Sequence, residues 1–82
     1  MGSMPYDKQR VEDAVLALLQ LTASDGLDGT MVAWKGYPWE VTDALHEKGL
    51  ISDPRSKRKS IVVTAEGARR SRRLFAELFG SD

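Results

Sequence analysis

The chain has 82 residues, of which 41% are hydrophobic and 29% charged, and it contains no cysteine. This composition predicts one small globular domain and excludes a disordered chain, a disulfide scaffold and a cysteine-based metal site. The longest apolar run, Ala14–Leu19, is too short to cross a bilayer, so we expect a soluble cytoplasmic protein with no membrane partner. We interpret residues 1–3 as an expression scar and residues 4–82 as the single domain.

The net charge of zero conceals an asymmetry along the chain. Residues 1–50 carry four basic and eight acidic groups, a balance of −4, whereas residues 51–82 carry eight basic and four acidic groups, a balance of +4. The second part is therefore a candidate anion-binding surface. The opposite charges of the two parts also suit contacts between copies of the chain.

The first predicted element is an amphipathic helix that begins after Asp7, a favourable N-cap, and ends at about residues 22–24. Apolar residues recur in it at three- and four-residue spacing, which is typical of a helix with one buried face. The expected inward residues are Val11, Ala14, Val15, Leu18, Leu19 and Thr22. Two Asp-Gly pairs then predict turns, and the apolar segment Thr30–Trp34 predicts a short strand.

A second helix is expected from Pro38, which favours a first helical turn, to Gly49, which suits a left-handed cap. The segments Leu50–Asp53 and Ser60–Thr64 are predicted strands on either side of a basic loop. Thr64 is the expected N-cap of a last helix that ends at Gly80. Its expected inward residues are Ala68, Leu74, Phe75, Leu78 and Phe79.

This order of elements predicts an α+β, winged-helix-like fold. It consists of a helix, a short strand, a helix, a two-stranded wing and a helix, so that three helices accompany a small antiparallel sheet. The basic loop Pro54–Lys59 is the predicted wing.

The sequence contains little that points to catalysis. It has one histidine, His46, and neither a cysteine nucleophile nor a phosphate-binding glycine loop. A metal site normally needs three or four protein ligands, and one imidazole near Asp43 does not supply them. We therefore expect no enzyme activity, no cofactor and no metal, and no small-molecule substrate is evident.

The wing places four cations within five residues, namely Arg55, Lys57, Arg58 and Lys59. Cations at a hairpin tip can bind DNA phosphates without reading sequence. The alternative is a solvated loop whose charges discourage pairing between strand edges. The preceding helix presents Glu40, Asp43 and Glu47 outward, and these carboxylates would repel DNA, so base reading by that helix is not expected.

Aromatic residues provide the candidate protein contacts. Trp34, Tyr37 and Trp39 lie within six residues and form either part of the core or an exposed patch, with Trp39 expected to face outward. The last helix has an apolar face wide enough for the first helix and a second chain. The candidate contact residues are Trp34, Tyr37, Trp39, His46, Phe75 and Phe79.

The wing region resembles that of multiple-antibiotic-resistance-type (MarR-like) transcriptional regulators. The resemblance covers the block Leu45–Ile51, the wing Asp53–Arg58 and the helix start Ile61–Gly67. It implies that Asp53 braces the wing and that Arg55 approaches DNA. Those regulators also have a support helix before the wing, whereas residues 25–37 here have room for a strand but hardly for that helix.

Over nearly its full length, the chain resembles a family of small bacterial proteins of unknown function. The shared segments are Ala14–Leu19 with Leu21-Thr22, Ala33–Gly36, Leu45–Pro54 and Leu74–Gly80. The leading hypothesis is a non-catalytic adaptor that contacts another protein or a second copy of itself, as in a homodimer. The alternative, which the acidic helix disfavours, is a DNA-binding accessory or regulator that contacts phosphates through the wing.

Overall fold

The computed structural model describes residues 5–34, 36–55, 57 and 59–80. Its elements are α1 (Lys8–Leu18), the 3-10 helix η1 (Leu19–Leu21), β1 (Ser24–Asp25), β2 (Met31–Trp34), α2 (Trp39–Glu47), β3 (Ser60–Val63) and α3 (Ala65–Phe79). The predicted α+β class is confirmed, with three α-helices and a small antiparallel sheet in the described part of the chain.

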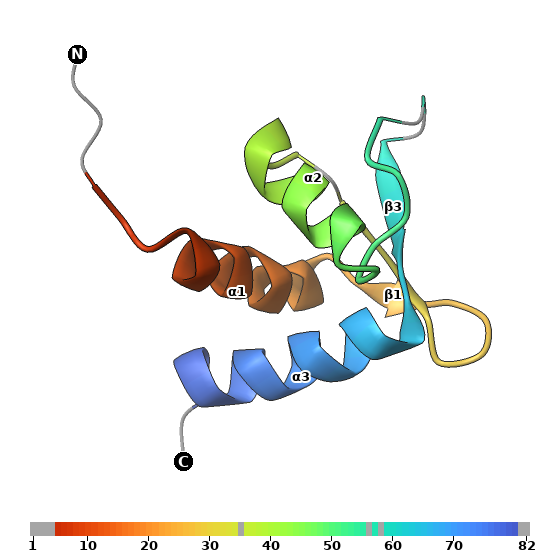
Figure 1. Cartoon of the computed structure of the whole chain (residues 1–82). Coiled ribbons are helices and arrows are strands. Elements are labelled where there is room, and N and C mark those ends of the chain that lie inside the picture. Colours follow the sequence, from red (N-terminus) through yellow and green to blue (C-terminus); the bar gives the residue numbers. More distant parts are fainter. Residues whose placement is uncertain (1–4, 35, 56, 58, 81–82) are drawn as a thin grey trace.

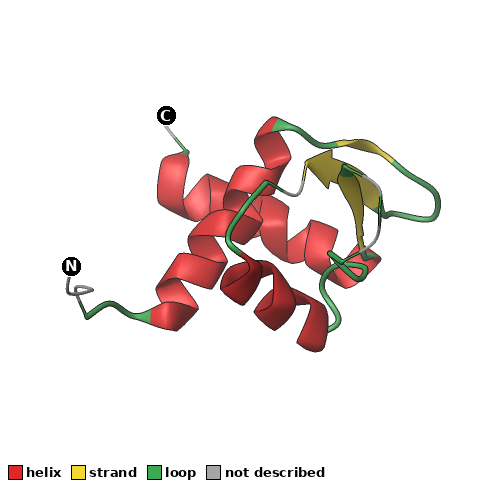
Figure 2. Ribbon diagram, turned by 90° about the horizontal axis from the view of Figure 1, so that it is seen from above, coloured by secondary structure: helices red, strands yellow, loops and turns green. Residues whose placement is uncertain are grey.

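The three strands form an antiparallel sheet in the order β1-β2-β3. The β2–β3 register runs from Met31 opposite Val63 to Trp34 opposite Ser60. Met31 and Val63 face the core, while Val62 and Trp34 on the other face of the sheet are 39% and 54% exposed. The helices lie on one side of the molecule and the sheet on the other (Figures 1 and 2). One sheet face is therefore covered by helices, and the other is largely open.

The core forms where α1 and α2 meet the sheet and the first half of α3. Its most buried large side chains include Leu16, Leu19, Leu45 and Val63. One polar group sits among them: the Ser71 hydroxyl donates a hydrogen bond to the Leu16 carbonyl oxygen at 2.6 Å and accepts one from Gln20 Nε2 at 2.8 Å. This buried hydroxyl is thus fully satisfied, as burial of a polar group requires.

The predicted helix boundaries are largely confirmed by their caps. The Asp7 carboxylate accepts from the Arg10 amide at 3.2 Å, and Thr64 Oγ1 accepts from the Gly67 amide at 3.1 Å. Gly49 has a φ of +74°, the left-handed conformation expected of a glycine that ends a helix. Helix α1 ends four residues earlier than residue 22 and continues as the short η1.

The prediction that Leu50–Asp53 forms the first strand of the wing is wrong in the length of the strand. Only Ile51 forms a β-bridge, with Val63, although the Ser52 amide also donates to the Val62 carbonyl oxygen at 2.8 Å. Ser52 Oγ then accepts from the Val62 amide at 2.9 Å, which replaces the next backbone bond. Pro54 has no amide hydrogen to extend the pairing.

The region before α2 contains the unpredicted strand β1, which pairs with β2 as a hairpin. Its two residues, Ser24 and Asp25, are polar and exposed, so they carry no apolar alternation that would indicate a strand. No helix occupies the described part of residues 25–37, in agreement with the expected lack of a support helix.

The expected inward face of α3 is wrong at its end. Leu78 and Phe79 are 51% and 47% exposed, whereas the buried residues of this helix are Gly67, Ala68 and Ser71. The part of α1 that lies near Leu78 and Phe79 offers Arg10, Asp13 and Ala14, which are polar or small and cannot cover two large apolar side chains. Thr22, expected inward at the end of α1, is also exposed.

Candidate functional site

Among the described residues, no three histidine, aspartate or glutamate side chains come together as a metal site would require. The single histidine, His46, lies near the end of α2 and places Nδ1 3.0 Å from the Ile51 carbonyl oxygen. Because a carbonyl only accepts, this bond places a hydrogen on Nδ1. His46 therefore ties the end of α2 to the segment that enters the wing, and it forms no pair with Asp43.

The wing residue Arg55 is held on α2. Its Nη2 donates to Asp43 Oδ2 at 2.7 Å, and its guanidinium carbon lies 5.5 Å from the centroid of the Trp39 ring. The Asp43 hydrogen bond and charge raise the pKa of Arg55 above its ordinary value. Asp53 Oδ1 accepts a hydrogen bond from the Arg55 amide at 2.9 Å.

The other wing cations differ from Arg55. Lys57 and Lys59 are exposed and make no hydrogen bond or ion pair within the described ranges. Arg58 lies outside the described residues. The three wing cations that the structure describes therefore do not form one uniform cluster, because Arg55, the arginine expected to approach DNA, already binds a carboxylate.

The basic residues of α3 are partly neutralised within the helix. Arg69 and Arg70 both contact the Glu66 carboxylate, the latter at 3.2 Å, and Arg73 lies 3.8 Å from Glu77. The Glu66–Arg70 and Arg73–Glu77 pairs each span one turn of the helix. The Arg69 hydrogen bond is the largest cause that lowers the pKa of Glu66 below its ordinary 4.5.

The three neighbouring aromatic residues divide between two surfaces. Trp34 extends from the open face of the sheet, and the half-buried Tyr37 meets it edge to face with 6.2 Å between ring centroids. Trp39, also 54% exposed, lies under Arg55 on α2. The expected outward position of Trp39 is confirmed, but Trp34 is equally exposed.

A third apolar surface lies where α1 begins and α3 ends, at the side opposite the sheet (Figure 1). Phe75 and Phe79 pack edge to face there, with 5.5 Å between ring centroids. A groove of about 470 Å³ separates the two helices and is lined by Arg10, Asp13, Ala14, Leu74, Glu77, Leu78 and Phe79. We call this surface the α1–α3 groove.

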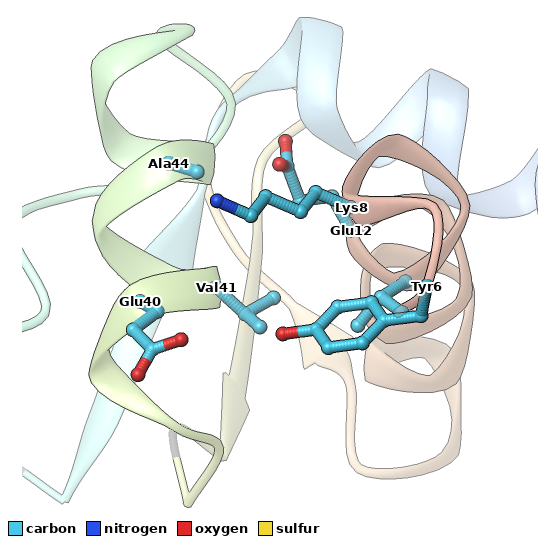
Figure 3. Close-up of a pocket in the computed structure, with 7 residues that line it drawn as sticks. Tyr6, Lys8, Glu12, Glu40, Val41 and Ala44 are labelled. Atoms are coloured by element: carbon cyan, nitrogen blue, oxygen red, sulfur yellow. The ribbon is translucent and has the colours of Figure 1, made fainter. Parts of the chain in front are cut away.

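A second groove, of about 340 Å³, lies between α1 and α2. Its lining residues are Tyr6, Lys8, Val11, Glu12, Glu40, Val41 and Ala44. Figure 3 shows Tyr6 and Lys8 extending from the α1 side toward α2. Sequence reasoning missed this α1–α2 groove because its two walls are about thirty residues apart and carry no shared motif.

No helix in the described ranges is long and apolar enough to cross a membrane. In comparisons with known proteins, residues 7–81 match the family model DUF6429, a domain of unknown function. The chain is 54% identical over 76 residues to "Uncharacterized protein y4hR" of Sinorhizobium fredii (strain NBRC 101917 / NGR234), which covers 93% of this chain and 97% of that relative. No solved structure matches it.

Proposed function

The chain belongs to the DUF6429 family, a domain of unknown function, and we propose that it is a non-catalytic protein-contact module that pairs with a second copy of itself. This agrees with the small family of unknown function expected from the full-length resemblance. The observation that carries the proposal is the α1–α3 groove, where Leu78 and Phe79 remain half exposed although they continue the apolar stripe of α3.

The charges around this groove favour a second copy as the occupant. Its rim carries Arg10 and Asp13 from α1 and Glu77, paired loosely with Arg73, from α3. In a two-fold dimer, each groove meets the same mixture of signs, so a basic group of one copy can face an acidic group of the other. A strongly acidic or strongly basic partner would instead meet repulsion from half of the rim.

The expected affinity of the dimer is low. Covering the exposed halves of Leu78 and Phe79 contributes about 1 kcal/mol for each side chain, while association costs several kcal/mol of lost freedom. The four half-exposed side chains of a two-fold dimer contribute about 4 kcal/mol, which is no more than the cost of association, so we expect a weak dimer that forms at high protein concentration rather than a permanent assembly.

Sedimentation velocity over a range of protein concentrations tests this proposal. We expect the average mass to rise from monomer to dimer, and Phe79→Ser to weaken the dimer by about tenfold or more. Leu27→Ser is the matched control, because Leu27 is 84% exposed on the β1–β2 hairpin, away from the groove. A monomer at every concentration, or equal weakening by both substitutions, would exclude this dimer.

A second candidate function is phosphate binding by the wing. The supporting observation is that Lys57 and Lys59 are exposed and unpaired within the described part of the chain, so both are available to a polyanion. Glu40 and Glu47 on the exposed side of α2 oppose it. This candidate would apply to DNA without sequence preference.

A titration of fluorescent duplex DNA at low salt tests the second candidate. Replacing Lys57 and Lys59 together by alanine should reduce binding and lower the salt dependence by about two counterions. Arg72→Ala is the control, because Arg72 is an exposed cation of α3 with no pair among the described residues. Absence of binding, or the same loss in the control, would refute wing binding.

A further inference from the structure

The α1–α2 groove combines an apolar floor with polar groups of both signs. Val11, Val41 and Ala44 supply the apolar surface, and the groove volume of about 340 Å³ falls in the range of small-molecule sites. In Figure 3, Tyr6 directs its hydroxyl toward Val41, and Lys8 directs its ammonium toward Ala44. The site is thus assembled from the N-terminal halves of α1 and α2 together with Tyr6, which precedes α1.

One of its polar groups is already neutralised. Glu12 has a side chain only 13% exposed, and its Oε1 lies 2.5 Å from Lys48 Nζ. Lys48 also donates to Gln9 Oε1 at 2.7 Å. This Glu12–Lys48 pair therefore adds little net charge to the groove.

Three other polar groups of the groove are exposed to solvent and have no partner among the described residues. The Tyr6 hydroxyl, the Lys8 ammonium and the Glu40 carboxylate make no hydrogen bond or ion pair with any of the described residues. Lys8 and Glu40 have opposite charges, so a ligand of either single charge is attracted by one and repelled by the other. A ligand that carries both charges is attracted by both.

We propose that the α1–α2 groove binds a small zwitterion with an apolar side chain, such as a free aliphatic amino acid. Its carboxylate pairs with Lys8, its ammonium pairs with Glu40, and its side chain covers Val11 and Val41. The Tyr6 hydroxyl is available for an additional hydrogen bond to the carboxylate. This site is separate from the α1–α3 groove of the proposed dimer, so a failure of one proposal leaves the other unaffected.

A titration with leucine, followed by backbone amide chemical shifts, tests the site. An open groove and a ligand of about nine non-hydrogen atoms predict a dissociation constant of about 1–10 mM. The shifts should lie in the N-terminal halves of α1 and α2. N-acetyl-leucine lacks the ammonium, leucine amide lacks the carboxylate and glycine lacks the side chain, and each should bind about threefold to tenfold more weakly.

Two substitutions test which residue of the groove binds each charged group of the ligand. Glu40→Gln should abolish the preference for leucine over N-acetyl-leucine, and Lys8→Gln should abolish the preference for leucine over leucine amide. Glu47→Gln, another exposed carboxylate of α2, is the matched control and should leave both preferences unchanged. The proposal is overturned if no shift saturates by about 50 mM leucine, if the shifts lie elsewhere, or if Lys8→Gln and Glu40→Gln leave the preferences unchanged.

Discussion

The two halves of α3 differ in the size of their apolar residues and in what covers them. In the first half, Gly67, Ala68 and Ser71 are small and buried against the rest of the molecule. In the second half, Leu78 and Phe79 are large and half exposed. The helix lies closest to its neighbours where its side chains are smallest, and its apolar stripe continues beyond the surface that α1 covers. We therefore expect the first half of α3 to stabilise the fold, and the second half to carry the proposed association with a second copy.

The largest expected loss of stability comes from a substitution at Gly67, where the first half of α3 approaches its neighbours closely. A Cβ at Gly67 would collide with the Leu50 carbonyl oxygen and lie 2.9 Å from Val63 Cγ1. Gly67→Ala should therefore lower the free energy of unfolding by about 3 kcal/mol or more, measured by urea denaturation. Ala76→Ser, at an exposed position of the same helix, is the control. A loss below about 1 kcal/mol would show that the helix moves aside easily.

A smaller effect is expected from the buried hydroxyl. Ser71→Ala removes the hydrogen bonds to the Leu16 carbonyl oxygen and Gln20 Nε2, which should cost about 1–2 kcal/mol in the same denaturation experiment. Ser24→Ala, on the exposed strand β1, should change stability by less than about 0.5 kcal/mol. Equal effects of the two substitutions would contradict a role for the buried bond.

Substitutions in the second half of α3 should affect dimer formation more than the stability of the fold. The double substitution Leu78→Ser and Phe79→Ser should abolish dimer formation in sedimentation velocity. The doubly substituted monomer should lose about 2 kcal/mol of stability at most, because only half of each side chain is buried in the monomer. A larger loss in the monomer would place these residues in the fold instead of in the interface.

The smallest effect concerns pH. Because contacts with Arg69 and Arg70 lower the pKa of Glu66 below 4.5, its contribution to stability is present above the unfolded pKa and is lost as the pH falls through the folded one. Wild type should therefore be more stable than Glu66→Gln at neutral pH, and the difference should vanish in acid. Thermal unfolding of both proteins from neutral pH to about pH 3 measures this difference in stability. A constant difference would rule out this linkage.

The sequence predicted the structural features that depend only on residues close together in the chain. Capping residues such as Asp7 and Thr64 could be identified because a cap is satisfied within three residues. The contact between Arg55 and Asp43 could not, because it joins residues twelve positions apart whose distance depends on how the wing folds back onto α2. Sequence alone therefore presented Arg55 as a free cation.

The apolar stripe of α3 shows a different limit. Helical spacing placed Leu78 and Phe79 on the same face as Leu74, and all three line the α1–α3 groove. Spacing does not reveal that the part of α1 beside them has no large apolar residue. The α1–α2 groove was missed for a related reason, since Lys8 and Glu40 line one groove only after both helices have packed. Candidate sites made by packing are visible only in three dimensions.

The buried bond between Ser71 and the Leu16 carbonyl oxygen also fixes the axial register of α3 against α1. Apolar contacts alone would tolerate a slip of one helical turn, about 5 Å, but such a slip would leave the hydroxyl without partners in the core. Phe79 lies eight residues beyond Ser71, about 12 Å along the helix. One hydroxyl near the sheet therefore determines which residues of α1 face Phe79 at the far end of the molecule.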